Sequence, residues 1–153
     1  MPGTLSEILI SDRANGQMSS KPLAEFITGK GIVGDRYFEN IGTFSEKLKG
    51  LPDCEVTLIE IEEILSFNKK TNLNYSPSDF RRNLVTSGIR LNNLVDKTFN
   101  VGTLQLKGIR LCEPCAHLSS LLGKEVLNQM VHKAGLRAQI IQGGVVKIGE
   151  QVG

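Results

Sequence analysis

The side chains best suited to chemistry are gathered in the stretch GIRLCEPCAHLSSLLG, where a predicted strand runs into a predicted helix. This stretch places Cys112, Cys115 and His117 close together. Thiols and imidazoles bind metals, exchange disulfides and act as nucleophiles. Four interpretations are therefore open: a metal site, a dithiol redox pair, a single reactive thiolate, or ordinary packing. Free cysteine is among the most buried residue types, and for Cys54 we adopt the packing interpretation.

A zinc site and a redox pair are the less favoured interpretations. A structural zinc site needs four ligands, which usually come as two separated pairs. Outside the cluster only Cys54 and His132 remain, and neither belongs to a second close pair. A dithiol suits a strand-to-helix junction, because a helix N-terminus lowers the pKa of a thiol. Thioredoxin-like folds, however, carry Cys-x-x-Cys after an early strand of a βαβ unit, whereas here the motif comes late in a β-rich chain.

A single functional thiolate at Cys115 is the third interpretation. Pro114 suits the first turn of a helix, which makes no use of the N–H group that proline lacks. Amides exposed at the start of the helix would favour a sulfur anion. The residues alone leave this interpretation and ordinary packing evenly balanced. His132, in the segment MVHKAG, is expected at a helix C-terminus, where the helix dipole favours it.

Short strands must position this cluster, and turn residues separate them. The patterns predict strands over residues 4–10, 22–28, 54–60, 83–86, 97–102 and 103–111. A glycine-rich loop is predicted over 29–38, and helices over 61–70 and around 118–130, the second interrupted at Gly123. The alternation of leucines slips by one residue beside Gly108, which predicts a β-bulge. The last segment, 136–152, reads as two strands forming a hairpin about Gly143–Gly144.

This arrangement predicts a mainly β fold. Many short strands with few helices favour a closed or nearly closed β-barrel carrying a few peripheral α-helices. A parallel βαβ sheet fits poorly, because helical segments do not alternate regularly with strands. The chain has 153 residues and shows no internal repeat or linker, so we expect a single domain over residues 1–153.

Composition excludes several classes of partner. Eighteen basic against sixteen acidic residues give a net charge of +2, which is too balanced to indicate a polyanion partner. Basic and aromatic residues do not interleave, so we expect no nucleic acid. No apolar run approaches the roughly 20 residues of a membrane helix, and no signal peptide is recognisable, so we expect no membrane. Three unevenly spaced cysteines do not form a disulfide framework, and a cytoplasmic location is expected.

Four segments taken together resemble a stand-alone MOSC domain, the family named for the C-terminal domain of molybdenum cofactor sulfurases. They are GKGIVGDRYF, RRNLVTSGIRLNNLVDKTFNVG, LCEPCAHL and HKAGLRAQIIQGGVVKIGEQV, and they follow in order from about Ile8 to Val152. The resemblance implies a β-barrel core and a site that handles the molybdenum cofactor or its sulfur. The signature cysteine of the family maps to Cys115. Family members are thought to carry sulfur on it as a persulfide, or to bind molybdenum through it.

The resemblance also directs attention to anion-binding residues. The pterin part of the cofactor carries a phosphate, which calls for arginines and backbone amides. The cofactor-binding candidates are Gly34, Asp35, Arg36, Arg81, Arg82, Asn83, His117 and Arg137. We expect Arg36 and one of Arg81 or Arg82 to contact the anion, Asn83 to brace its loop, and His117 to cap or pack the helix start. Cys112, found in part of the family, could resolve a persulfide on Cys115 by forming a disulfide.

The chain departs from the family pattern at three places. Many members carry Glu-Asn where this chain has Arg82-Asn83, and glycine where it has Asp96. The ending GEQV replaces a more usual Gly-Asp. The added arginine leaves open whether ligand and chemistry match the better-known branches.

Two functions follow from the resemblance. The first is a cofactor-binding or sulfur-carrier module, supplied by a sulfur donor such as a cysteine desulfurase or serving a molybdoenzyme partner. No pyridoxal phosphate site is expected, because a desulfurase domain does not fit in 153 residues; the family's association with that cofactor belongs to the fused sulfurases. The second is a molybdenum-dependent reductase of N-hydroxylated compounds. It would need a separate electron-donor protein, because the chain has no flavin, haem or iron–sulfur motif. A barrel that binds another anionic metabolite is the third option.

Overall fold

A computed structural model describes residues 2–48 and 51–153, apart from the side chain of Asp53. The described chain contains strands, three α-helices and short 3-10 turns. The strands are β1 (Gly3–Ile10), β2 (Ser19–Lys21), β3 (Leu23–Ile27), β4 (Gly31–Ile32), β5 (Val56–Glu60), β6 (Leu84–Ser87), β7 (Thr98–Val101), β8 (Leu104–Leu111), β9 (Leu136–Gln142), β10 (Gly144–Lys147) and β11 (Gln151–Val152). The helices are α1 (Ile61–Thr71), α2 (Ala116–Leu122) and α3 (Glu125–Gln129).

Seven strands close into a barrel, as the sequence predicted. They run in the order β11–β7–β8–β9–β5–β6–β1, and β1 pairs back with β11 through Gly3 and Thr4. Strand β2 extends the sheet beyond β1, and β10, β3 and β4 form a second, smaller sheet. The only parallel pair of named strands within the described residues is β5–β6, which α1 connects. The fold is therefore mainly β with one local βαβ unit.

The chain has two apolar cores. One fills the barrel with alternate residues of its strands, including Leu58 and Leu84, which face each other across β5 and β6. The next residue of each strand, Ile59 and Val85, points outward and packs beneath the helices. This outer core lies between barrel and helices because successive strand residues face opposite sides. It fixes where α2, and therefore the thiol before it, lies.

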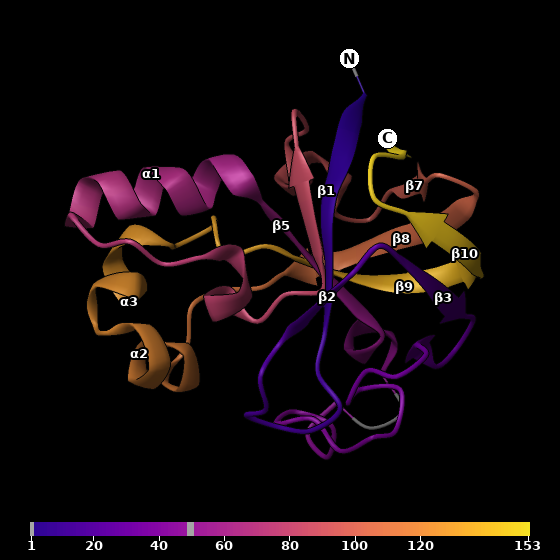
Figure 1. The fold of residues 1–153 in the computed structure, drawn as a ribbon, viewed down its shortest axis with the longest axis horizontal. Helices are drawn as coiled ribbons and strands as arrows, with labels where there is room; N and C mark the ends of the chain where they lie inside the picture. The colour runs from indigo at the N-terminus through magenta and orange to yellow at the C-terminus, as the bar shows by residue number, and fades with distance from the viewer. Residues whose placement is uncertain (1, 49–50) are drawn as a thin grey trace.

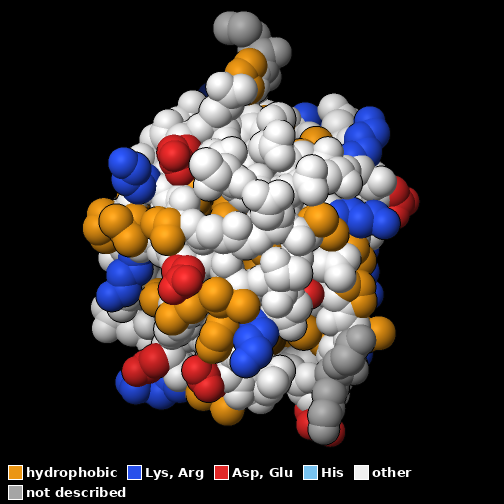
Figure 2. Space-filling view, turned by 90° about the vertical axis from the view of Figure 1, so that its right-hand side faces the viewer, with side chains coloured by type: hydrophobic (Ala, Val, Ile, Leu, Met, Phe, Trp, Pro, Cys, Tyr) orange, Lys and Arg blue, Asp and Glu red, His pale blue; other side chains and the backbone are white. Residues whose placement is uncertain are grey.

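Figure 1 shows where the helices lie relative to the barrel. The three α-helices lie together beside the barrel, and the irregular segment after β4 lies below it. Figure 2 shows the right-hand side of Figure 1, the side of β3 and β10, where apolar side chains form small groups interrupted by charged ones. No helix within the described residues is long and apolar enough to cross a membrane.

The predicted bulge in β8 is confirmed. The pairing of β8 with β9 shifts register between Gly108 and Arg110. Gly108 is required there because a Cβ atom would lie 2.1 Å from the carbonyl oxygen of Leu94. Beyond the bulge, β8 runs directly to the residues that carry the two close cysteines.

The predicted C-terminal hairpin is wrong. Strand β9 pairs with β5 and β8 in the barrel, whereas β10 pairs with β3 in the second sheet. The chain changes sheets at Gly143, where a Cβ atom would lie 2.3 Å from the carbonyl oxygen of Phe26. A close backbone approach, and not a hairpin turn, explains the glycine pair. Strands β2, β4 and β11 were not predicted, since two or three residues carry too little pattern.

Candidate functional site

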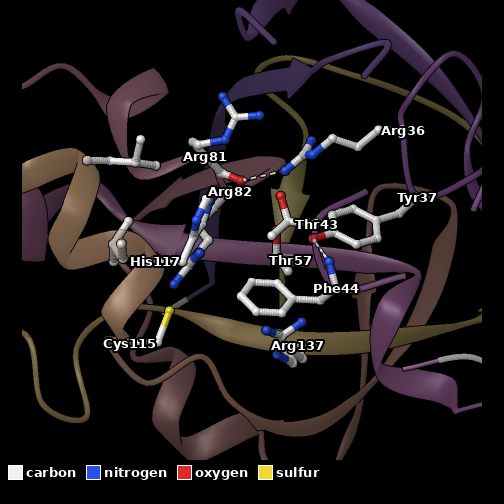
Figure 3. Close-up of a pocket in the computed structure, with 12 residues that line it drawn as sticks. Arg36, Tyr37, Thr43, Phe44, Thr57, Arg81, Arg82, Cys115, His117 and Arg137 are labelled. Carbon is white, nitrogen blue, oxygen red and sulfur yellow. Dashed lines mark hydrogen bonds between the residues drawn. The ribbon is translucent and has the colours of Figure 1, made fainter. Parts of the chain in front are cut away.

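A pocket opens between α2 and the segment over residues 36–44. The space inside it that a water-sized sphere can occupy is about 40 Å³, and the pocket is in part open to solvent. Its lining residues are Arg36, Tyr37, Thr43, Phe44, Thr57, Arg81, Arg82, Cys115, His117, Leu118, Leu121 and Arg137. Four arginines and one thiol thus come from four separate parts of the chain, since Arg81 and Arg82 are neighbours (Figure 3).

Arg36 is held by a buried ion pair. Its Nη1 lies 3.0 Å from Asp35 Oδ1, and the two side chains are 5% and 0% exposed. Asp35 also accepts the Ser11 N–H group at 3.1 Å, which ties the loop to the end of β1. The Nη2 of Arg36 donates to the carbonyl oxygen of Arg81 at 3.3 Å (Figure 3). Arg36 therefore positions its neighbour as well as adding charge.

Arg81 has a guanidinium nitrogen without a partner in the described part of the chain. A capping box between Ser76 and Asp79 starts a 3-10 turn over Pro77–Phe80, and Arg81 ends it in the left-handed conformation, with φ of 61°. Its Nη1 donates to the carbonyl oxygen of Gly16 at 2.6 Å. Its Nη2 is buried and makes no hydrogen bond to any described residue. Burial, and after it the nearby charge of Arg36, lowers the pKa of Arg81. This is the direction expected of a buried cation whose charge is not fully balanced by anions.

Arg82 and Arg137 add two more positively charged side chains to the wall of the pocket. The Nε of Arg82 donates to the carbonyl oxygen of Ala134 at 2.8 Å, which leaves its outer nitrogens for another acceptor. The guanidinium carbon of Arg137 lies 5.7 Å from the centroid of the Phe44 ring. Guanidinium groups bind phosphate and carboxylate oxygens in forked pairs, so this wall can hold a polyanion.

Cys115 supplies the sulfur of the pocket. It is the residue before α2, it is partly buried, and its carbonyl accepts the Ser119 N–H group at 2.9 Å, which begins the helix. His117, in the first turn, lies edge-on to Phe44 with ring centroids 6.0 Å apart. In Figure 3, Cys115, His117 and Arg82 lie on one side of the pocket, and Arg36 lies on the other. His117 therefore packs, which is one of the two roles expected for it.

A clasp holds the loop that carries Cys115. The carboxylate of Glu113 accepts the backbone N–H group of His132 at 2.7 Å and lies 2.6 Å from its ring Nδ1. The expectation that His132 ends a helix is wrong, since α3 stops at Gln129 and His132 has a φ of 60° in the following turn. Its ring faces Glu113 instead of a helix terminus.

Asn83 braces three strands behind the pocket. Its Oδ1 accepts from the backbone and hydroxyl of Thr57 in β5, at 3.1 and 3.2 Å. Its Nδ2 donates to the carbonyl oxygen of Leu9 in β1 at 3.1 Å. The bracing role expected of the amide is confirmed. It fixes Arg82 and Thr57 next to each other on the pocket wall.

Comparison with known proteins adds the family. The model of the MOSC domain matches residues 45–153, more than half of the chain. The chain belongs to the MOSC-domain family. The MOSC family is in general associated with the molybdenum cofactor, and the protein is in this general sense a molybdenum-cofactor-related domain. No curated protein matches this chain.

Solved structures share the fold of this MOSC domain at low sequence identity. YuaD from Bacillus subtilis is 16% identical with a TM-score of 0.84, over 99% of this chain and 94% of that one. YiiM from Geobacillus stearothermophilus is 12% identical with a TM-score of 0.70, over 99% and 74%. YiiM from Escherichia coli is 18% identical with a TM-score of 0.67, over 99% and 68%. At these identities the likeness concerns the fold.

The structure brings together six of the ten predicted site residues of this MOSC domain. These are Arg36, Arg81, Arg82, Cys115, His117 and Arg137. Asp35 and Asn83 are buried behind the pocket, as described above. Gly34 is exposed and lines a different hollow with Ile10 and Arg13. Cys112 is 1% exposed and does not line the pocket, so its role as a resolving thiol stays a prediction.

The geometry gives less support to a disulfide or a metal site at the cysteines. None of the three cysteines forms a disulfide in the described chain. Among the described residues, no cluster of three or more His, Cys, Asp and Glu side chains is arranged to hold a metal ion. Cys54 is half-buried, which differs from the fully buried residue expected, and its thiol lies 3.5 Å from the carbonyl oxygen of Leu51.

Sequence reasoning missed half of the lining. The missed residues are Tyr37, Thr43, Phe44, Thr57, Leu118 and Leu121. Leu118 was recognised only as part of an apolar helix face. Phe44 lies in GTFSEK, a segment without a regular period, so nothing in its pattern indicated that it would lie over a pocket.

Proposed function

We propose that this MOSC domain holds the molybdenum cofactor in the arginine pocket, with the Cys115 thiolate as the sulfur ligand of the metal. The observation that carries the proposal is a thiol opening into a pocket whose walls bear four arginines, one of them with a buried nitrogen that lacks a partner among the described residues. A buried donor without an acceptor costs about 1–3 kcal/mol, and an anionic ligand would remove that cost.

The residues present fit the cofactor. Its phosphate needs several cationic donors, and Arg81 and Arg82 have donors directed at neither backbone nor carboxylate. Asp35, whose charge also acts on Arg81, pairs with Arg36 at 3.0 Å. A thiolate is a soft donor of the kind that molybdenum accepts. Arg81 and Arg82 would hold the phosphate, and Cys115 would bind the metal.

The remaining residues orient and enclose the ligand. Arg36 fixes the backbone of Arg81 by donating to its carbonyl oxygen. Phe44 and Leu118 supply apolar walls that limit water near the sulfur. Electrostatic attraction is stronger where water is limited, so the arginines act more strongly there than on an open surface. When bound, the cofactor supplies a redox-active metal centre.

A sulfur-carrier role is the second candidate for the same site. A persulfide on Cys115 would be a small anion beside cations, and the thiol is partly exposed, as a carrier requires. Arg81 and Arg82 both have donors for a ligand, and two arginines side by side suit the phosphate of the larger ligand. A carrier would need a sulfur-donor protein, and a reductase of N-hydroxylated compounds would need an electron-donor protein.

Reconstitution tests the proposal. Metal-free protein would be mixed with molybdenum cofactor released from a molybdoenzyme, separated by gel filtration, and analysed for molybdenum and protein-bound phosphate. We expect near-stoichiometric molybdenum on the wild type, loss of molybdenum in Cys115→Ser, and at least tenfold weaker retention in Arg81→Gln and Arg82→Gln. Lys69→Gln, an exposed charge at the end of α1, is the matched control and should retain the cofactor. Equal retention by all variants would refute the assignment.

A further inference from the structure

Two arginines of the pocket belong to a closed circuit of hydrogen bonds. Its six members are Ser11, Arg13, Gly16, Asp35, Arg36 and Arg81. Arg36 and Arg81 line the pocket, and the other four members support them from outside its lining. We call this set the Ser11 circuit, because both of its halves begin at that residue.

The first half of the Ser11 circuit holds the backbone of Arg81. Ser11 follows β1 and is 2% exposed. Its N–H group donates to Asp35 Oδ1 at 3.1 Å, and its carbonyl oxygen accepts the Arg36 N–H group at 2.6 Å. Asp35 Oδ1 also accepts Arg36 Nη1 at 3.0 Å, and Arg36 Nη2 donates to the carbonyl oxygen of Arg81 at 3.3 Å. This half uses backbone atoms of Ser11 alone.

The second half holds the guanidinium group of Arg81. The Ser11 hydroxyl donates to the carbonyl oxygen of Arg13 at 2.9 Å, and the Gly16 N–H group donates to the same oxygen at 3.1 Å. The carbonyl oxygen of Gly16 accepts Arg81 Nη1 at 2.6 Å. A Cβ atom on Gly16 would lie 2.7 Å from Ser11 Oγ, so the loop closes tightly on the hydroxyl. This half therefore depends on the side chain of Ser11.

The two halves together fix the direction of the free donors of Arg81. A guanidinium group is planar, and its N–H groups point in fixed directions. With the backbone and Nη1 both held, Nη2 has a set position, and it has no partner among the described residues. An arginine held in this way loses less side-chain freedom when an anion binds, which raises affinity.

We propose that Ser11 is a positioning residue of the anion site. Its hydroxyl holds the loop that presents the Gly16 carbonyl oxygen, and this oxygen holds Arg81 ready for an oxyanion. The identity of the anion rests on the function proposed above. Because Ser11 does not line the pocket, its effect on binding passes through Arg81.

Ser11→Ala separates the two halves of the circuit. Alanine keeps the backbone groups that bind Asp35 and Arg36 and loses only the hydroxyl. In NMR spectra at low temperature, we expect the Nη1 and Nη2 protons of Arg81 to give separate signals in the wild type and to merge in Ser11→Ala, as the guanidinium becomes free to rotate. Ser11→Thr keeps the hydroxyl and should keep the signals separate. Gly16→Ala forces a Cβ atom against Ser11 Oγ and should merge them.

Titration with inorganic phosphate, followed by NMR of the metal-free protein, measures the effect on binding. We expect Ser11→Ala and Gly16→Ala to lower the affinity about fivefold, the cost of ordering one free side chain on binding. Ser11→Thr should bind as the wild type does. The matched control is Thr71→Val, which removes another hydroxyl that donates to a carbonyl oxygen, that of Phe67 at 2.7 Å near the end of α1. It should change neither the affinity nor the Arg81 signals.

Double variants show whether the effect passes through Arg81. Ser11→Ala should cause no further loss of affinity in Arg81→Gln, and the full loss in Arg82→Gln, since Arg82 is outside the circuit. Unchanged Arg81 signals in Ser11→Ala, or the full loss in Arg81→Gln as well, would overturn the proposal. A wild type that does not bind phosphate would contradict the proposed function, and the Arg81 signals, which need no ligand, would then decide the positioning role.

Discussion

Asp35 lies in the loop beside the pocket without lining it, and we expect its charge to contribute strongly to the free energy of unfolding. Its side chain is 0% exposed and pairs with Arg36, which is itself 5% exposed. Asp35→Asn keeps the shape and removes the charge, and so leaves Arg36 buried without its counter-ion. Breaking a buried pair from one side costs about 3–5 kcal/mol, so we expect the free energy of unfolding to fall by about 3 kcal/mol or more. For a chain of this size that lowers Tm by roughly 6–12 °C.

Urea unfolding followed by circular dichroism measures this loss. Asp12→Asn is the matched control: Asp12 and its partner Arg13 are 78% and 72% exposed, so the change should stay within about 0.5 kcal/mol. In Asp35→Asn with Arg36→Met, the unpaired charge is gone, and stability should recover by about 1 kcal/mol or more relative to Asp35→Asn. If Asp35→Asn costs no more than Asp12→Asn, the buried pair is not what holds this loop.

Three further predictions concern the frame of the site. Burial raises the pKa of Glu55 above 4.5, so its stabilising contribution is full below about pH 4.5 and is lost as pH rises through the folded pKa. Glu55→Gln should therefore gain stability relative to wild type as pH rises from 4 to 7 in urea titrations, and a pH-independent difference would contradict this. Glu113→Gln weakens an exposed pair with His132, so the free energy of unfolding should change by no more than about 1 kcal/mol. Hydrogen exchange of the backbone amides over residues 111–118 should become faster. Gly108→Ala forces a Cβ atom against the Leu94 carbonyl and should lower the free energy of unfolding by about 2–3 kcal/mol. A decrease below about 0.5 kcal/mol would mean that the backbone of the bulge can shift to admit the methyl group.

The sequence was sufficient for the barrel and for the chemical centre of the site. Alternating apolar residues predicted most strands, and the slip beside Gly108 predicted the bulge that precedes the cysteines. The resemblance to the MOSC family, carried in part by the GDR, RRN and GLRA segments, pointed to all four pocket arginines. These features depend on neighbouring residues, which a sequence shows directly.

Features that depend on distant contacts were not predictable. The glycine pair at Gly143 indicated a hairpin, but β10 pairs with β3, which lies more than a hundred residues earlier. Phe44 covers the pocket because of its contacts with Arg137 and His117, and no local period reports such contacts. The clasp between Glu113 and His132 likewise joins two loops that are adjacent only after the barrel has closed.

The most direct test of the central claim is the molybdenum content and intact mass of the untreated protein. Native-state mass spectrometry and elemental analysis would compare the wild type with Cys115→Ser and Cys112→Ser. The account predicts bound molybdenum in the wild type and in Cys112→Ser, and its loss in Cys115→Ser. A gain of about one sulfur atom on Cys115, removed by a reducing thiol and without molybdenum, would contradict the cofactor-holding function and establish the carrier instead.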